Sequence, residues 1–142
     1  MTTRSQAKES IYKRFADNWL DDQSAERTEF ALGDEQFDPP DGPHVRVTIR
    51  HLDRSQETLN KVGARKFETV GLLTMQYRQP PKASEETMEG HVEKAIEIFE
   101  GIRIGGTTIR FGSVIGRELG LIDKDRWNAT NVQGNFIYTE TK

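Results

Sequence analysis

Residues 66–78 alternate in character along their whole length, and this alternation limits the choice of fold more than any other part of the sequence. Alternate positions on one side are mostly apolar or small: Phe67, Thr69, Gly71, Leu73, Met75 and Tyr77. The positions between them are mostly polar: Lys66, Glu68, Thr74, Gln76 and Arg78. A period of two residues predicts a long strand with one covered face. Val70 and Leu72 are apolar residues on the polar side, and we expect a loop or a partner to cover them.

Two helices are predicted, one before and one after this strand. In residues 7–20 the apolar side chains recur at helical spacing, and Thr3 with Gln6 forms a capping box, so this helix should end near residue 21 or 22. The second helix should run from about residue 84 to residue 100, with Ser84 as N-cap and Gly101 at its C-terminal end. Its predicted inward side chains are Met88, Val92, Ala95, Ile96 and Phe99.

Further strands are predicted for residues 27–32, 45–50, 108–111 and 131–139, with a turn-rich segment at 37–43. The last strand should turn Val132, Phe136 and Tyr138 to one side. We interpret residues 53–65 as a polar connection, whereas residues 112–128 are ambiguous. The order predicts a single α+β domain over residues 1–142. Two helices should pack on one face of a mostly antiparallel sheet of about four to five strands.

The composition restricts the function. The net charge of -3 argues against a surface that grips nucleic acid through its phosphates. Cysteine is absent, which excludes disulfides, thiolate nucleophiles and thiolate zinc sites. No apolar run approaches the roughly 20 residues of a membrane span, and the N-terminus lacks the apolar stretch of a signal peptide. We therefore expect a protein of the cytoplasm in which it is made.

No residue pattern predicts an active site, a cofactor site or a metal site. His44 and His51 lie seven residues apart on one predicted strand, which sends their rings to opposite faces. The residues that would meet His91 on one helix face are Thr87, Met88, Lys94 and Ala95, and none of them is a good metal ligand. We interpret all three as surface histidines. The glycine-rich stretch 101–106 follows a helix instead of a strand, the wrong context for a phosphate loop. We therefore expect a protein without catalytic activity.

Charge gathers on two predicted surfaces. The second helix carries a stripe of glutamates at helical spacing: Glu86, Glu89, Glu93, Glu97 and Glu100. The stripe is either a solvated helix face or a docking surface for a basic partner. Basic side chains project from the sheet face that the helices should leave open: Arg46, Arg50, Lys66, Arg78 and Arg110. An acidic helix and a basic sheet face on different sides of one subunit are what a head-to-tail interface requires, and such interfaces can close into rings.

The segment 37–47 reads FDPPDGPHVRV and resembles the signature of the tail terminator (tail completion) family of tailed bacteriophages. In that family an aromatic residue and prolines lead through Asp-Gly-Pro into a Val-Arg-Val strand. Further matches follow in order: the basic-aromatic segment 65–67, a strand with Gly71, the break at 80–81, an amphipathic helix, the segments 104–106 and 109–111, and a closing aromatic strand. The resemblance extends over essentially the whole chain.

The resemblance implies a small subunit that forms a ring, a homohexamer, on the end of a long phage tail. Such a ring ends polymerisation of the tail tube protein and provides a surface for the head–tail connector protein. Genomic DNA passes through its lumen without specific binding. The resemblance implies no catalytic residue, metal or cofactor, and a location in the virion tail after synthesis in the host cytoplasm. The glutamate stripe would face a neighbouring subunit or the lumen, and segments 53–65 and 112–128 would order on docking.

Two alternative functions remain open. A head-completion or neck (connector) subunit of related fold would differ in the partner that each face meets. A small-molecule or peptide-binding module would instead use the open sheet face as its pocket. Only a terminator should cap tail tubes and fix their length.

Overall fold

A computed structural model describes residues 2–20, 29–33 and 42–142, which form two helices and one five-stranded sheet. The predicted α+β class is therefore confirmed. The predicted turn at 37–43 and the first residues of the strand predicted at 27–32 lie largely outside the described residues. In chain order the elements are α1 (Arg4–Leu20), β1 (Glu29–Leu32), β2 (His44–Gln56), β3 (Lys66–Gln79), α2 (Glu85–Phe99), β4 (Arg110–Ile122) and β5 (Trp127–Thr141).

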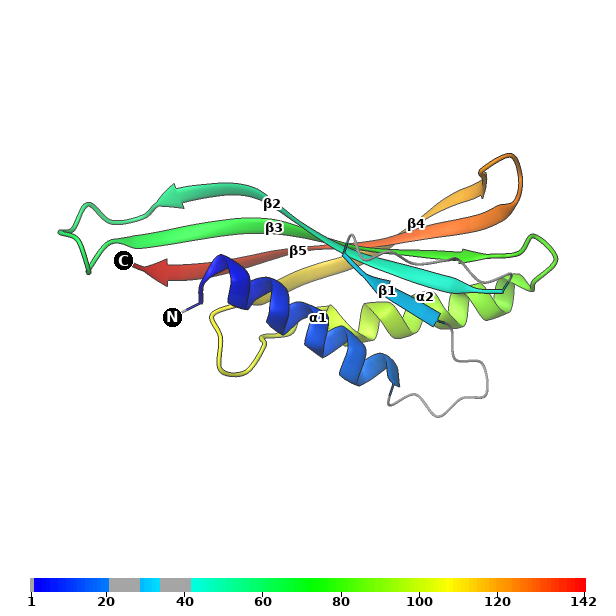
Figure 1. The fold of residues 1–142 in the computed structure, drawn as a ribbon, viewed down its shortest axis with the longest axis horizontal. Coiled ribbons are helices and arrows are strands. Elements are labelled where there is room, and N and C mark those ends of the chain that lie inside the picture. The colour runs from blue at the N-terminus through cyan, green and yellow to red at the C-terminus, as the bar shows by residue number, and fades with distance from the viewer. Residues whose placement is uncertain (1, 21–28, 34–41) are drawn as a thin grey trace.

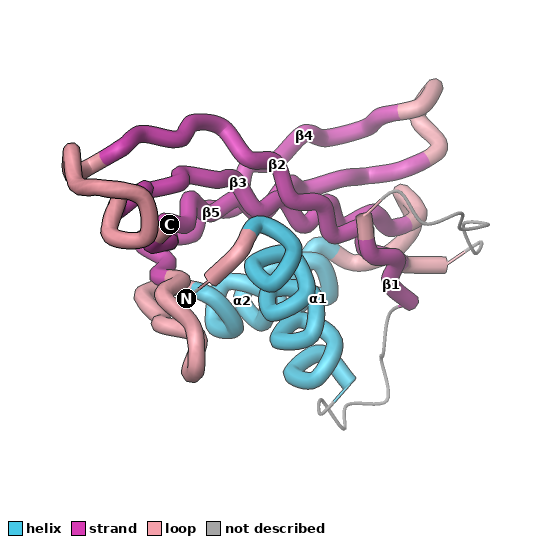
Figure 2. Tube along the Cα trace, turned by 60° about the vertical axis from the view of Figure 1, so that its left-hand side comes forward, coloured by secondary structure: helices cyan, strands magenta, loops and turns pink. Residues whose placement is uncertain are grey.

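The strands are arranged in the order β1-β2-β3-β5-β4. β1 runs parallel to β2, and every other neighbouring pair is antiparallel. Both helices pack on the same face of the sheet (Figures 1 and 2). The end of the β2–β3 hairpin, the β2–β3 arm (residues 52–68), extends past the N-terminus of α1, and the end of the β4–β5 hairpin, the β4–β5 arm (residues 115–128), rises away from α2 at the opposite end (Figure 1).

The core lies between the helices and the covered face of the sheet. α1 contributes side chains spaced four residues apart: Ala7, Ile11, Phe15 and Trp19. Most of the predicted inward residues of the two long central strands are buried, whereas Phe67 is only partly buried. The large buried ones are Leu73, Met75, Tyr77, Val132, Phe136 and Tyr138. A Cβ at Gly71 would lie 2.2 Å from Cζ of Phe136. Glycine therefore lets the Phe136 ring lie against the backbone of β3.

Capping residues fix the start of α1 and both ends of α2 at the predicted places, whereas the predicted end of the first helix near residue 21 or 22 lies outside the described residues. Thr3 Oγ1 accepts a hydrogen bond from the Gln6 backbone N–H at 3.2 Å, and Gln6 Oε1 accepts one from the Thr3 N–H at 3.0 Å. Ser84 Oγ accepts a hydrogen bond from the Thr87 N–H at 3.2 Å. Gly101 follows α2 with φ of 65°, in the left-handed region that favours glycine.

The segments without a clear sequence pattern are largely strands, so the expectation of two long polar connections is wrong. β2 continues to Gln56, opposite Phe67, and β4 continues to Ile122, opposite Trp127. The connections that remain are residues 57–65 and 123–126. Most side chains in the outer halves of β2 and β4 are exposed on both faces. These stretches therefore lack the alternation that reveals a half-covered strand, although their backbone pairing is regular.

Candidate assembly surface

The sheet face opposite the helices carries an apolar strip, which we define as Val70, Leu72 and Ile137. Val70 and Leu72 lie on this face as predicted, and both are partly buried. The register places Ile137 of β5 beside Val70. Ile137 was missed in the sequence, although its position between the buried residues Phe136 and Tyr138 assigns it to the open face.

Cationic residues flank the apolar strip. Arg50 of β2 lies opposite Leu72, and Arg110 of β4 lies opposite Ile137. Both arginines are exposed, and Lys66 is exposed at the start of β3. An apolar centre with a polar rim is the usual anatomy of a protein–protein interface.

The other predicted cations of this face are bound within the subunit. Arg46 donates a hydrogen bond from Nη1 to the Gly33 carbonyl oxygen at 2.8 Å, and so holds the turn that follows β1. Arg78 donates from Nε to Gln76 Oε1 at 2.9 Å, and Gln76 donates in turn to Asn131 Oδ1 at 3.0 Å. Arg46 and Arg78 therefore have structural partners on the face where the sequence placed them.

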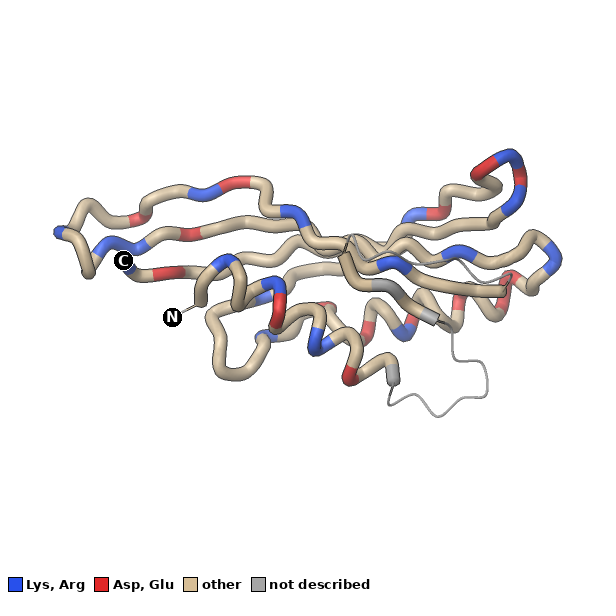
Figure 3. The backbone as a smooth tube through the Cα atoms, in the orientation of Figure 1, with Lys and Arg blue, Asp and Glu red and all other residues tan. Residues whose placement is uncertain are grey.

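The glutamates of α2 form an exposed stripe: Glu86, Glu89, Glu93, Glu97 and Glu100. The opposite side of α2 is buried and includes His91 and Ile98, which the sequence analysis did not place there, whereas the predicted inward residue Ile96 is only partly buried. The stripe thus faces away from the core. Figure 3 shows the acidic positions of α2 in the helical layer on one side of the sheet. Glu100 Oε2 also accepts the Val114 backbone N–H at 3.1 Å, which ties the end of α2 to β4.

Large apolar side chains are exposed on the two arms. Such residues elsewhere in the described part of the chain are buried or partly buried. Isolated exposed apolar residues are common on protein surfaces, but a concentration of them on two projecting hairpins indicates contact surfaces. The exposed fractions are 57% for Leu52, 95% for Leu59 and 79% for Val62 on the β2–β3 arm, and 55% for Ile115, 44% for Leu119 and 54% for Leu121 on the β4–β5 arm.

Each arm also has a free strand edge. β1 pairs with β2 only as far as Val47, so no described strand pairs with the outer edge of β2 from there to Gln56. On β4 the Gly112 carbonyl still accepts the Gly101 N–H at 3.0 Å, but beyond it the outer edge faces no strand in the described ranges. Free edges offer backbone donors and acceptors to another chain. The free edges of β2 and β4 were not predicted, because the outer halves of these strands lack an alternating pattern in the sequence.

The interpretation of the histidines as surface residues is wrong. His44 is buried, with its ring edge-on to that of Trp127 at a centroid distance of 4.8 Å. His91 is buried in the core between α2 and the sheet. His51 lies opposite Gly71 on the helix-covered face, with both ring nitrogens buried. An imidazole has an apolar body and a polar tip, so its burial depends on neighbours that the sequence does not show.

Two further observations concern metal and membrane binding. The residues that the structure describes contain no group of three or more His, Asp or Glu side chains placed to hold a metal ion. In the same ranges neither helix has the length and apolar character needed to cross a membrane. The apolar strip, the glutamate stripe and the two arms are the surfaces from which a function can be argued.

The fold recurs among proteins of known structure. No protein-family model and no curated protein matches the sequence. One similar solved structure, whose name is a serial designation without functional meaning, covers 97% of this chain and 96% of its own, with a TM-score of 0.71 and 12% identity. At this identity the likeness shows that the two chains share a fold.

Proposed function

We propose that this protein is a tail terminator, a structural subunit of a bacteriophage tail. It assembles as a homohexameric ring on the end of the tail tube, ends polymerisation of the tube protein and offers a surface to the head–tail connector protein. The observation that carries the proposal is the placement of exposed apolar side chains and free strand edges on two arms at opposite ends of one sheet. The family resemblance along the chain supports the same assembly.

Two different surfaces at opposite ends of a subunit suit a head-to-tail contact. In such a contact one surface of each subunit meets the other surface of the next, and the series closes into a ring when the rotation permits. The apolar strip with Arg50 and Arg110 then supplies a separate surface for the tube or the connector. The protein acts by binding, without catalysis, and is located in the virion tail after synthesis in the host cytoplasm.

The glutamate stripe has two uses that fit a ring. It contacts a basic surface of the neighbouring subunit, or it lines the lumen and repels the phosphates of the passing DNA. Both uses require exposed carboxylates that have no ion pair within the subunit, and no salt bridge to these glutamates occurs among the described residues.

Electron microscopy of tails assembled with and without the protein tests this function. We expect uniform tails when the protein is present, and tubes of irregular, mostly greater length when it is absent. Uniform tubes in its absence would contradict the proposal. A head-completion or neck subunit would leave tube length uniform and produce unjoined heads and tails, so the same micrographs distinguish that alternative.

A variant of the apolar strip makes the test specific to one surface. Leu72→Asp places a charge that would have to be buried on docking, and we expect the folded variant to fail to restore uniform tails. Thr74→Asp is the matched control, because Thr74 lies on the same face of β3 outside the apolar strip, with Gln133 as its hydrogen-bonding neighbour at 3.5 Å. Equal restoration by both variants would show that the apolar strip is not a docking surface.

A further inference from the structure

A pocket of about 300 Å³ lies where the N-terminus of α1 approaches the bulged part of β2. It is separate in its chemistry from the apolar surfaces described above, because polar and titratable side chains from four elements form most of its wall. These include Arg4 of α1, His51 and Arg54 of β2, Thr69 of β3, and Tyr138 and Glu140 of β5. The volume is at the small end of the range for ligand sites.

His51 is the most unusual group in this wall. Its ring is edge-on to those of Phe136 and Tyr138, at centroid distances of 6.1 and 5.8 Å. Nδ1 and Nε2 are both buried, and neither has a hydrogen-bond partner among the described residues. Buried polar side-chain atoms nearly always have a partner. An imidazole beside a pocket, with neither nitrogen bonded to a described residue, is a group that a ligand can satisfy once the ring turns a nitrogen toward the pocket.

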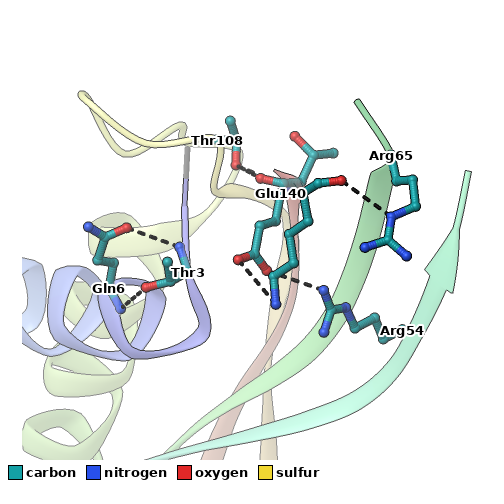
Figure 4. Close-up of polar contacts among 8 residues, drawn as sticks. Thr3, Gln6, Arg54, Arg65, Thr108 and Glu140 are labelled. Atoms are coloured by element: carbon teal, nitrogen blue, oxygen red, sulfur yellow. Dashed lines mark hydrogen bonds and ion pairs between the residues drawn. The ribbon is translucent and has the colours of Figure 1, made fainter. Parts of the chain in front are cut away.

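The carboxylate of Glu140 is already paired. Glu140 is buried, with Oε2 at 3.3 Å from Nη2 of Arg54 and Oε1 at 3.7 Å from Nζ of Lys142. Figure 4 shows Arg54 reaching across from the β2–β3 arm to Glu140 at the end of β5. The negative charge of Glu140 is therefore balanced within the subunit.

Arg4 supplies a positive charge that is not balanced in this way. The residue is exposed, and it has no hydrogen bond or ion pair to any other described residue through its side chain. Burial, together with the charges of Arg4 and Lys8, lowers the pKa of His51 below its usual value of 6.5. The ring of His51 is thus neutral near pH 7 and lies in a positive potential. A positive electrostatic potential around the neutral His51 imidazole favours the binding of an anion at this place.

We propose that this pocket binds a carboxylate group. The guanidinium of Arg4 presents paired N–H donors whose geometry matches the two oxygens of a carboxylate, and His51 donates from one ring nitrogen after its ring turns toward the pocket. Burial raises the pKa of the Tyr138 phenol, against a hydrogen bond with Thr69 that lowers it, so the Tyr138 hydroxyl in the wall stays protonated. All of these groups belong to one subunit, so the site does not depend on the proposed ring.

The ligand is a monoanion, because the exposed carboxylate of Asp53 in the same pocket repels a second negative charge. This repulsion distinguishes a carboxylate from a phosphate dianion. Two sources present the same chemical group: a short free acid, and an acidic side chain carried by another polypeptide. The experiment below separates them.

NMR titration of the His51 ring tests the site. Butyrate represents a free acid, and N-acetylglutamate N-methylamide represents a side chain on a polypeptide; both are added at constant ionic strength. We expect saturable shifts of the His51 resonances and a rise in the His51 pKa, because a bound anion stabilises the imidazolium. Binding should tighten as the pH falls through the raised pKa. The charged and titratable groups that surround the ring are Arg4 and Lys8 of α1, Asp53 and Arg54 of β2, and Tyr138 and Glu140 of β5.

Two variants localise the site. Arg4→Gln removes the paired donors at an exposed position and should weaken butyrate binding about tenfold or more. Lys13→Gln is the matched control: it removes the same charge from an exposed residue of α1, about 13 Å further along the helix, and should leave binding unchanged. Unchanged affinity in Arg4→Gln, or no saturable His51 shift with either probe at millimolar concentration, would overturn the proposal.

The identity of the best probe completes the test. If butyrate binds at least as tightly as N-acetylglutamate N-methylamide, the ligand is a free acid. If only N-acetylglutamate N-methylamide binds, the ligand is an acidic side chain of a polypeptide. Tighter binding of inorganic phosphate than of either probe would overturn the assignment to a carboxylate.

Discussion

At the scale of single residues, Gly71 shows how an absent side chain determines the packing around it. A Cβ there would lie 2.2 Å from Cζ of Phe136, and 2.7 Å from both Cε atoms of that ring. The obstacle is a fully buried ring in the centre of the sheet, which has little freedom to move aside. The sequence places Gly71 on the covered face, but it does not show which ring the glycine meets.

We expect Gly71→Ala to lower the free energy of unfolding by about 1–3 kcal/mol, because the added methyl group displaces the Phe136 ring. Denaturation in urea, followed by circular dichroism, measures the change. Gly90→Ala is the matched control in α2, where no atom lies within 4 Å of the added Cβ. That variant should gain up to about 1 kcal/mol from helix propensity. A loss of similar size in both variants would contradict this account of the packing.

The burial of apolar residues in the central strands could be predicted from the sequence, whereas the environment of the polar residues could not. Alternation correctly assigned Leu73 and Met75 to the core, because their partners are uniformly apolar. It did not assign His91, whose ring stacks on that of Tyr77 at a centroid distance of 5.0 Å. That contact joins α2 to β3. Because the two residues are far apart in the sequence, no local sequence pattern predicts that they meet.

At the scale of elements, the covered halves of the strands were predictable and the outer halves were not. The inner half of β2 alternates because one of its faces meets the core, whereas its outer half is exposed on both faces. β4 shows the same contrast, with a bulge between Phe111 and Val114 that interrupts any alternation. The starts of both helices and the end of α2 were predicted, since their caps are local features of the sequence.

The glutamate stripe belongs to this scale, and charge reversal tests its role in assembly. We expect Glu93→Lys with Glu97→Lys to fold with stability within about 0.5 kcal/mol of the native protein, since both positions are exposed. If the stripe contacts a neighbouring subunit, the variant should form fewer rings in sedimentation velocity experiments.

The matched control for this reversal is Glu9→Lys with Asp17→Lys, which makes the same change of charge at exposed positions of α1. The control should assemble like the native protein. Rings of native size in the Glu93 and Glu97 variant would exclude the interface role and leave a role in the lumen or a merely solvated helix face.

At the scale of the whole molecule, the sequence indicated part of the proposed assembly surface. Val70 and Leu72 stood out because they interrupt a polar face, and the glutamate stripe stood out through its spacing. The two arms could not be predicted, because an arm is a product of tertiary structure: a hairpin that extends beyond the helices that cover the rest of the sheet. Exposure of an apolar residue such as Leu121 is a consequence of that geometry.

We expect Leu119→Ser with Leu121→Ser to reduce self-association and tube capping while the subunit stays folded, because the β4–β5 arm loses exposed apolar surface. Sedimentation velocity over a range of concentrations measures the association. Arg117→Ser with Glu118→Ser is the matched control on the same arm, with the net charge unchanged and both residues exposed. Equal association of the two variants would show that this arm does not join subunits.

The position of β5 affects how the chain can fold as it is synthesised. β5 follows β3 and β4 in the sequence, yet it lies between them in the sheet. Until β5 has emerged from the ribosome, β3 and β4 cannot be joined, and the strand edges that will flank β5 remain open. A polypeptide that terminates before β5 therefore exposes two unpaired strand edges, which can pair with those of other chains.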